Sequence, residues 1–362
     1  MENFSNINKV IPFNDIEKET SHNLDSCSHG SIYSSMNILK VKIDFSSNIN
    51  PLGISRLVLK EIKKNIKQIS HIYPDPNCTL LKKSIAHYIQ NGIDQNWINI
   101  GNGATELIHN FVRCHSSKNS IIPSPTFCEY ELASKRCEMK INYVPLSKKL
   151  QVEPDLIIEK VKENSNSLIF FCNPNNPTGL VNTEAIQKIL SSINSSQTIL
   201  LVDESFLDFL NDIEKKSMIS KIKEFDNLAI LRSMTKSYGL AGLRLGYLIA
   251  NPKLIQQLKS HQITWNVNGI AQIAGIAALN DQEYICKTKK IIQKELAGIG
   301  ETLRHFGQRR VPSSMLSRGV AGVREKTVVV NLPGSAKGVS QSLNSILPGL
   351  IHAFDMLEGK KH

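Results

Sequence analysis

The chain has 362 residues, enough for one large domain or for two to three domains of ordinary size. Hydrophobic residues make up 41% of it and charged residues 21%, which is typical of globular proteins and excludes a mostly disordered chain. The formal net charge of +11 would suit an anionic substrate, but no zinc-finger, RNP or arginine-repeat pattern supports nucleic-acid binding. No apolar run approaches the roughly 20 residues of a membrane helix, and no secretory signal is evident. We therefore expect a cytoplasmic protein that binds neither nucleic acid nor membrane, and the scattered cysteines predict no metal site.

Along the chain, an arm rich in serine and asparagine comes first, followed by alternating helix-like and strand-like segments. Strands are expected at residues 97–100, 120–122, 168–171, 199–202, 228–231 and 247–250. Amphipathic helices are expected at residues 79–90, 106–114, 183–192 and 252–261. This alternation predicts an α/β domain with a mostly parallel sheet between helices.

Four of the expected strands are followed directly by small, polar or charged residues. The four segments that follow them are residues 101–106, 173–179, 203–205 and 232–236. In sheets of this kind ligands bind beyond the carboxyl ends of the strands, so these segments predict a ligand site.

The last of these segments, together with residues 242–246 that follow it, combines anion-binding groups with a reactive amine. Ser233, Thr235 and Arg244 can bind a phosphate, the arginine through a two-pronged contact. Lys236 can form a Schiff base with an aldehyde if a crowded cationic neighbourhood deprotonates its amine. A solvated surface cluster remains the alternative for these residues taken alone.

Asp203, at the end of a hydrophobic strand, can hold a heterocyclic ring nitrogen protonated, although a helix cap is its alternative interpretation. The turn Gly103-Ala104-Thr105 can open a helix whose free N–H groups bind the same phosphate. Asn176 can donate to a phenolic ring oxygen, and Phe127 can stack on the ring or belong to the core.

Together these residues describe a site for pyridoxal 5′-phosphate, and here the sequence resembles the fold-type I aminotransferase family in the order and spacing of its motifs. The resemblance implies that Lys236 is the Schiff-base lysine and that Asp203 pairs with the pyridinium nitrogen. It also implies that Asn176 lies near the ring hydroxyl. Ser233, Thr235 and Arg244 would then hold the phosphate, with the backbone of Gly103, Ala104 and Thr105 helping.

Within that family, the chain looks most similar to the threonine-phosphate decarboxylases of cobalamin biosynthesis, with histidinol-phosphate aminotransferases next. The segments that carry this resemblance are residues 44–53, 73–75, 101–106, 203–209 and 265–268. Aminotransferases usually have a tyrosine at the position of Phe206, so the phenylalanine favours the decarboxylases. The resemblance implies a substrate site that includes His29, Gly30, Asn48 and Asn50.

Tyr73 resembles the tyrosine that reaches the cofactor phosphate of a partner subunit, which implies a homodimer with composite sites. The implied reaction is decarboxylation of L-threonine O-3-phosphate to (R)-1-aminopropan-2-yl phosphate. The alternatives are an aminotransferase acting on histidinol phosphate and a catalytically impaired fusion protein.

The impaired alternative arises from the last part of the chain. We expect an arm over residues 1–47, a cofactor-binding domain over 48–297 and a distinct segment over 298–362. This last segment resembles the C-terminal part of MogA-like molybdopterin adenylyltransferases, with matching residues at 314–324, a strand at 327–331 and a helix through 353–357. It would replace the usual small domain and its substrate-binding arginine.

Overall fold

The computed structural model describes residues 47–164, 166–193, 197–292, 321–324 and 327–330. Ser47 and Asn48 belong to an N-terminal unit, and the described residues from Ile49 onward belong to a second compact unit. The second unit contains the sheet, the helices around it and the site described below.

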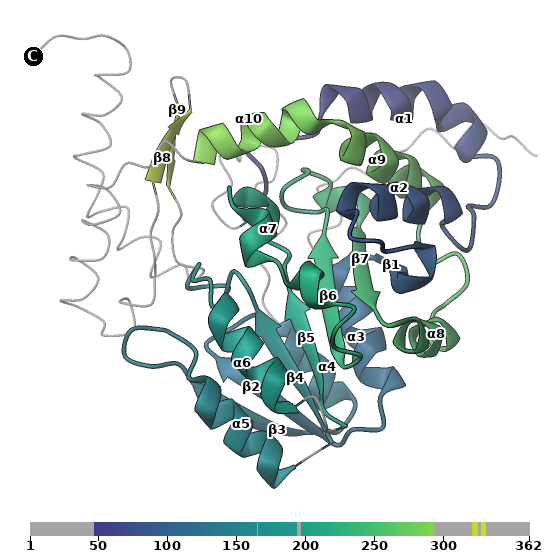
Figure 1. The fold of residues 1–362 in the computed structure, drawn as a ribbon. Helices are drawn as coiled ribbons and strands as arrows, with labels where there is room; N and C mark the ends of the chain where they lie inside the picture. Colours follow the sequence, from purple (N-terminus) through teal and green to yellow (C-terminus); the bar gives the residue numbers. More distant parts are fainter. Residues whose placement is uncertain (1–46, 165, 194–196, 293–320, 325–326, 331–362) are drawn as a thin grey trace, which may run out of the picture. The chain divides into compact units, whose positions relative to one another are not determined.

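A seven-stranded sheet forms the centre of this second unit, and Figure 1 shows helices packed on both of its sides. Its strands in spatial order are β1 (Ile98–Asn102), β7 (Leu245–Ala250), β6 (Leu228–Ser233), β5 (Ile199–Asp203), β4 (Ser167–Cys172), β2 (Asn119–Ser124) and β3 (Lys140–Pro145). Strand β7 is antiparallel to both β1 and β6, and the other paired strands are parallel. The predicted α/β class with a mostly parallel sheet is therefore confirmed.

The helices pack on the sheet in two layers, and each layer shares a cluster of buried hydrophobic side chains with the sheet. The helices are α1 (Arg56–Ile69), α2 (Thr79–Ile89), α3 (Gly103–Cys114), α4 (Glu129–Arg136), α5 (Pro154–Glu163), α6 (Thr183–Ile193), α7 (Ile213–Lys216), α8 (Pro252–Ser260), α9 (Gly269–Asn280) and α10 (Gln282–Ile292), with short 3-10 turns η4 (Gln95–Trp97), η5 (Leu207–Phe209), η6 (Met218–Lys221) and η7 (Ala241–Leu243). One cluster joins the sheet to α3, α4 and α8, and the other joins it to α2, α5, α6 and α9.

Alternation along the strands decides which side chains face which layer. In β5, Leu201 belongs to the α3/α4 layer, while Leu200 and Val202 belong to the α5/α6 layer. Because successive side chains point to opposite faces of a sheet, Asp203 lies on the face of Leu201. The strands β4, β5, β6 and β7 are buried along nearly their whole length, as expected for strands covered on both faces.

The expected strands agree with the structure to within a few residues, but some elements were not predicted. Strand β3 and helices α1, α4, α5, α9 and α10 were not foreseen, nor was the antiparallel direction of β7. The strand expected at 327–331 appears as β9 (Thr327–Val330), which pairs with β8 (Ala321–Arg324) in an antiparallel hairpin. The rest of the segment 298–362 lies outside the described residues, so its resemblance to MogA-like proteins stays a prediction.

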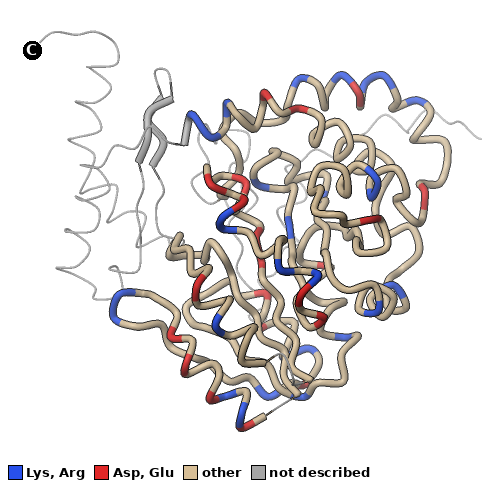
Figure 2. Tube along the Cα trace, in the orientation of Figure 1, with Lys and Arg blue, Asp and Glu red and all other residues tan. Residues whose placement is uncertain are grey.

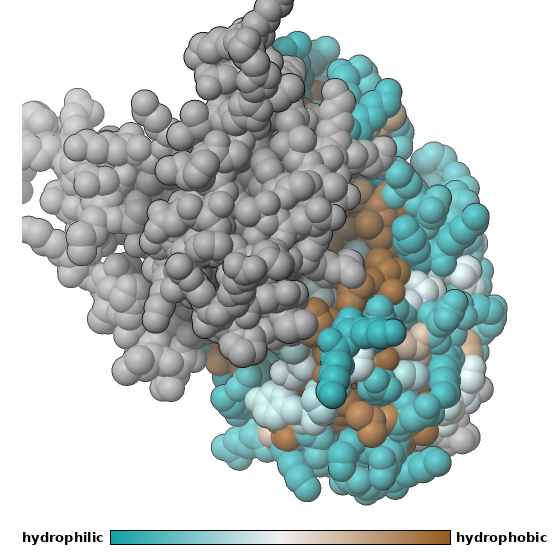
Figure 3. All heavy atoms as spheres, turned by 90° about the vertical axis from the view of Figure 1, so that its left-hand side faces the viewer, coloured by the Kyte–Doolittle hydropathy of each residue, from teal (hydrophilic) through white to brown (hydrophobic). Residues whose placement is uncertain are grey.

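The surface of the described residues carries many charged side chains. Figure 2 shows lysines and arginines along α1, whose exposed residues include Lys60, Lys63, Lys64 and Lys67. On the face shown in Figure 3, described residues are mainly hydrophilic, with hydrophobic residues gathered between them. Among the described residues, no helix combines the length and the apolar character needed to cross a membrane.

Candidate active site

The predicted site residues of this second unit converge on one edge of the sheet. Strands β4, β5 and β6 run in the same direction, so their carboxyl ends, with Asp203 and Ser233, lie at the same edge. Strand β7 runs the opposite way, and its first residues pair with the last residues of β1 and β6. Arg244, directly before β7, is therefore brought to the same edge as Lys236, directly after β6.

Asp203 is a buried carboxylate with two hydrogen-bond donors. Its side chain is 3% exposed, and Oδ2 accepts a hydrogen bond of 2.7 Å from the hydroxyl of Tyr130. Oδ1 accepts one of 2.9 Å from the backbone N–H of Ser205. Burial raises the pKa of Asp203, while the bonds from Ser205 and Tyr130 and the nearby Lys236 partly oppose that rise. A carboxylate with an unused lone pair in this setting can accept a hydrogen bond from a protonated ring nitrogen.

Tyr130 is a residue of the site that the sequence analysis missed. It is fully buried, its ring stacks on Phe170 at 5.1 Å, and Phe127 meets it edge-on at 5.6 Å. Burial, followed by the charge of Asp203, raises the pKa of Tyr130 well above its ordinary value, so the hydroxyl stays a donor. The available signal was the closeness in sequence of a second aromatic residue to Phe127, since Tyr130 follows it by three residues at the start of α4.

Lys236 carries an amine whose environment favours the neutral form. Its side chain is partly buried in the turn after β6. Burial lowers the pKa of Lys236, the positive charge of Arg244 lowers it further, and Asp203 acts in the opposite direction. A lysine with a lowered pKa is a better nucleophile toward an aldehyde at neutral pH.

A cradle for an anion lies where Arg244 meets the start of α3. Gly103 has a positive φ of 83°, and a Cβ added there would lie 2.4 Å from the Arg244 guanidinium. A Cβ on Gly246 would lie 2.7 Å from the backbone nitrogen of Ala104, so strand β7 also approaches this helix end closely. The Asn102 side chain makes no capping hydrogen bond there. Free N–H groups at a helix start, with a guanidinium against them, form an arrangement that binds phosphate.

Ser233 and Thr235 supply hydroxyls at the same edge. Both are 3% exposed, and their hydroxyl oxygens lie 2.7 Å apart. The Thr235 backbone N–H donates to Ser233 Oγ at 3.3 Å, which fixes the pair at the start of the turn. One of the two hydroxyls donates to the other, so the acceptor of that pair keeps its own proton to donate to an anion beside Arg244.

The loop after β4 holds Asn176 in place through its neighbour Asn175. The Asn175 side chain donates to the Pro125 carbonyl at 3.2 Å and accepts from Thr126 Oγ1 at 2.9 Å. These bonds join the loop that carries Asn176 to the loop that carries Phe127. The structure thereby brings the predicted ring-oxygen donor and the predicted stacking residue to neighbouring loops at one edge of the sheet.

The comparisons with known proteins show the family of this chain. The family model of the class I and II aminotransferases matches residues 40–316, which extends past the boundary we expected at residue 297. The chain belongs to this family. It is 38% identical over 261 residues, covering 71% of this chain and 69% of the relative, to a protein of Caldanaerobacter subterraneus subsp. tengcongensis named "putative threonine-phosphate decarboxylase".

Two solved structures extend the comparison. The histidinol-phosphate aminotransferase of Clostridium acetobutylicum is 32% identical, with a TM-score of 0.66 over 73% of this chain and 78% of that one. The histidinol-phosphate aminotransferase of Sinorhizobium meliloti, solved in complex with pyridoxal-5′-phosphate, shares the fold. It has a TM-score of 0.68 at 20% identity and covers 86% of this chain and 90% of that chain.

In this member of the aminotransferase family, the predicted cofactor residue Tyr73 is exposed. Its side chain is 77% exposed and stacks on Trp265, at a ring distance of 4.6 Å. The Trp265 loop is joined to the anion cradle, because Asn266 Nδ2 donates to Glu106 of α3 at 2.9 Å. Tyr73 and the cradle are thus connected through one loop.

The predicted substrate residues have different positions. Asn50 is 3% exposed, and both N–H groups of its side chain donate within the protein, to Ser237 O at 2.7 Å and to Thr288 Oγ1 at 2.6 Å. The Asn50 side chain therefore has internal partners, and its part in a substrate site stays a prediction. Asn48 is exposed and belongs to the N-terminal unit, while His29 and Gly30 lie outside the described residues.

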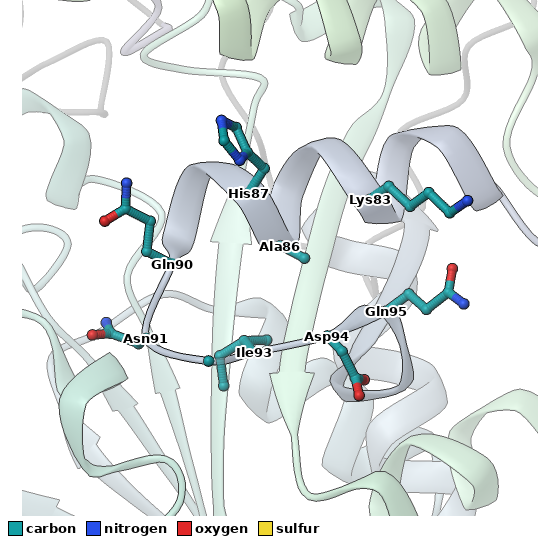
Figure 4. Close-up of a pocket in the computed structure, with 9 residues that line it drawn as sticks. Lys83, Ala86, His87, Gln90, Asn91, Ile93, Asp94 and Gln95 are labelled. Carbon is teal, nitrogen blue, oxygen red and sulfur yellow. The ribbon is translucent and has the colours of Figure 1, made fainter.

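A surface hollow of about 500 Å³ lies at the other end of β1 and is separate from this site. It is lined by the end of α2 and the segment that leads to η4, as Figure 4 shows. Since η4 directly precedes Ile98, the hollow adjoins the start of β1, whereas the anion cradle follows its end. Within the described part of the chain, no group of three or more potential metal ligands is found.

Proposed function

We propose that this protein is a pyridoxal 5′-phosphate-dependent enzyme that decarboxylates L-threonine O-3-phosphate to (R)-1-aminopropan-2-yl phosphate. The observation that supports it most strongly is the convergence of a buried acid, a lysine of lowered pKa and an arginine-lined helix start at one sheet edge. These groups match the ring nitrogen, the aldehyde and the phosphate of this cofactor.

The donor set fits the cofactor. Arg244, the two hydroxyls of Ser233 and Thr235, and the N–H groups at the start of α3 would hold the phosphate. Asp203 would pair with the ring nitrogen, and Phe127 would lie on the ring face. When bound, pyridoxal phosphate supplies an aldehyde for an amine and a ring that accepts the electron pair left by a broken bond at the substrate α-carbon.

The protein's own groups have separate tasks in this proposal. The neutral amine of Lys236 would hold the cofactor at its aldehyde carbon, with water as the leaving group. Asp203 would keep the ring nitrogen protonated because its charge, held by Tyr130 and Ser205, stabilises a cation. Once the substrate amine replaced it, the Lys236 amine in its protonated form would hold the proton that the substrate α-carbon takes up when CO₂ is lost.

Two observations favour decarboxylation. The relative of 38% identity carries the name of a threonine-phosphate decarboxylase. Position 206, beside the buried acid, is a phenylalanine, which cannot donate the ring-oxygen hydrogen bond that a tyrosine provides in aminotransferases.

Transamination of histidinol phosphate is the second candidate, because the Clostridium acetobutylicum enzyme is 32% identical over most of both chains. Both reactions use the same cofactor groups, so only the residues that orient the substrate separate them. The residues we expect in that role, His29, Gly30 and Asn48, lie outside the second unit.

A homodimer with composite sites is part of the proposal. The exposed aromatic pair Tyr73 and Trp265 is accompanied by exposed Ile72 and Ile263, with 59% and 76% exposure. Exposed apolar side chains that gather on two adjoining loops mark an association surface. In a second copy of the chain, Tyr73 would reach the phosphate of the partner's cofactor.

The test is to incubate the cofactor-loaded protein with L-threonine O-3-phosphate. CO₂ release without an oxo-acid acceptor supports the lyase, whereas consumption of histidinol phosphate only in the presence of 2-oxoglutarate supports the aminotransferase. Neither reaction, in a protein that still binds cofactor, supports the impaired alternative. Lys236→Ala should lose the yellow colour of the lysine adduct, and persistence of that colour would contradict the assignment of Lys236.

A further inference from the structure

The turn that carries Lys236 is held at its next residue, Ser237, by hydrogen bonds to two different atoms. The Ser237 carbonyl accepts from Asn50 Nδ2 at 2.7 Å, and the Ser237 hydroxyl donates to Asp208 Oδ2 at 3.2 Å. The Lys236 carbonyl accepts from the Asn50 backbone N–H at 3.0 Å. Ser237, Asn50 and Asp208 are each at most 3% exposed.

The first support of Ser237 is Asn50, whose side chain is itself held by Thr288 of α10. Thr288 Oγ1 accepts the second N–H of the Asn50 side chain at 2.6 Å and donates to the Tyr284 carbonyl at 2.9 Å. Asn50 Oδ1 accepts from the Leu52 N–H at 3.0 Å, so the Asn50 amide is fully used. Thr288 is 1% exposed, and its hydroxyl therefore fixes which way the Asn50 amide faces.

The second support of Ser237 is Asp208, which belongs to a buried cluster of charged side chains. Arg232 Nη1 donates to Asp208 Oδ1 at 3.3 Å, and Arg232 Nε donates to Glu204 Oε2 at 2.8 Å. Arg232 Nη2 donates to Ser217 Oγ at 3.0 Å, which completes the cluster. Arg232 is 6% exposed, so the cluster is held away from water.

This cluster lies on the face of the sheet opposite to the acid of the site. In β6, Leu228 and Ile230 face the α5/α6 layer, so alternation places Arg232 there and Ser233 on the other face. Glu204 alternates with Asp203 in the same way. The cluster therefore supports the turn that carries Lys236 from the face of the sheet opposite to Asp203.

We propose that Thr288 and Asp208 are positioning residues for Lys236, which hold Ser237 from two sides and thereby fix where the lysine side chain begins. This inference rests on the proposed function of Lys236. A lysine side chain has many rotamers, so its amine reaches an aldehyde carbon efficiently only if its backbone is fixed. Thr288 links α10 to the turn that carries Lys236.

The test compares two ligands on cofactor-free protein. Pyridoxal 5′-phosphate has an aldehyde that Lys236 can capture as a C=N bond with loss of water, whereas pyridoxine 5′-phosphate has an alcohol and binds only non-covalently. Thr288→Val removes the hydroxyl at nearly constant volume, and Thr288→Ser restores it. We expect Thr288→Val to weaken binding of the aldehyde about tenfold, equivalent to ~1.4 kcal/mol, with pyridoxine phosphate bound as in the unaltered protein. Thr288→Ser should recover most of the loss.

Two further variants complete the test. Ser237→Ala removes the bond to Asp208 and should show the same selective loss for the aldehyde, even if Thr288→Val folds poorly. Thr198→Val is the matched control, because Thr198 is also fully buried and its hydroxyl accepts a backbone bond of 3.3 Å, but at the start of β5. It should bind both ligands as the unaltered protein does.

The outcomes separate this inference from the proposed function. Borohydride reduction followed by peptide mass spectrometry shows whether Lys236 forms the adduct in the unaltered protein. If no adduct forms there, the proposed function is wrong, and this inference is overturned with it. Suppose instead that the adduct forms in the unaltered protein. If Thr288→Val and Ser237→Ala then bind both ligands with normal affinity, or lose affinity for both ligands equally, only the positioning role is overturned.

Discussion

The hydrogen bond between Tyr130 and Asp203 gives the most quantitative prediction, tested by Tyr130→Phe. A hydrogen bond to a charged group contributes about 1.5–3 kcal/mol, so its loss should raise the pKa of Asp203 by about one to two pH units at ~1.36 kcal/mol each. The ring packing on Phe170 and against Phe127 is retained. Any change should therefore arise from the hydroxyl.

The effect should depend on pH with a defined sign. Burial already raises the pKa of Asp203 above its ordinary value of 3.8, so ionised Asp203 opposes folding of the cofactor-free protein. This unfavourable contribution is absent below the unfolded-state pKa and grows as the pH rises through the folded-state pKa. Tyr130→Phe should thus differ little from the unaltered protein near pH 4 and be less stable by about 1.5–3 kcal/mol at pH 8.

The assay is urea unfolding of both cofactor-free proteins at several pH values between 4 and 8. Tyr143→Phe is the control, because Tyr143 is 49% exposed and removal of its hydroxyl should leave stability nearly unchanged. A loss of stability in Tyr130→Phe that is the same at every pH would refute the reasoning, since it would mean that the hydroxyl does not act through the charge of Asp203.

Three further predictions follow from the site. Gly103→Ala should weaken cofactor binding by at least tenfold in a titration, because a side chain at a φ of 83° is strained and its Cβ would displace the Arg244 guanidinium; normal affinity would contradict the cradle. Trp265→Ser should leave the fold intact but shift the protein toward monomer in analytical ultracentrifugation, and an unchanged mass would remove this surface from the dimer. Because burial and Arg244 lower the pKa of Lys236, trinitrobenzenesulfonate should modify Lys236 in the cofactor-free protein at a lower pH than in Arg244→Gln, and the same pH dependence in both proteins would contradict the effect of Arg244.

The sequence predicted the parts of the site that occupy strand ends. Asp203, Ser233 and Lys236 follow hydrophobic runs that can only be buried strands, and parallel strands bring their carboxyl ends to one edge. It did not predict that β7 runs antiparallel, although that direction brings Arg244 to the same edge. Strand direction depends on how connections cross the sheet, which local composition does not encode.

The residues that the sequence analysis missed act through other residues. Tyr130 and Thr288 look like ordinary helix positions in the sequence, and their roles arise only because folding places each hydroxyl against a partner more than 70 residues away. Asn50 is another example, because its motif indicated a substrate contact but did not indicate that its side chain donates to the Ser237 carbonyl and its backbone N–H to the Lys236 carbonyl. Long-range hydrogen bonds of this kind leave no periodicity in the sequence. The positions of the side chains at the strand ends could therefore be predicted from local patterns, but the hydrogen bonds around them required the folded chain.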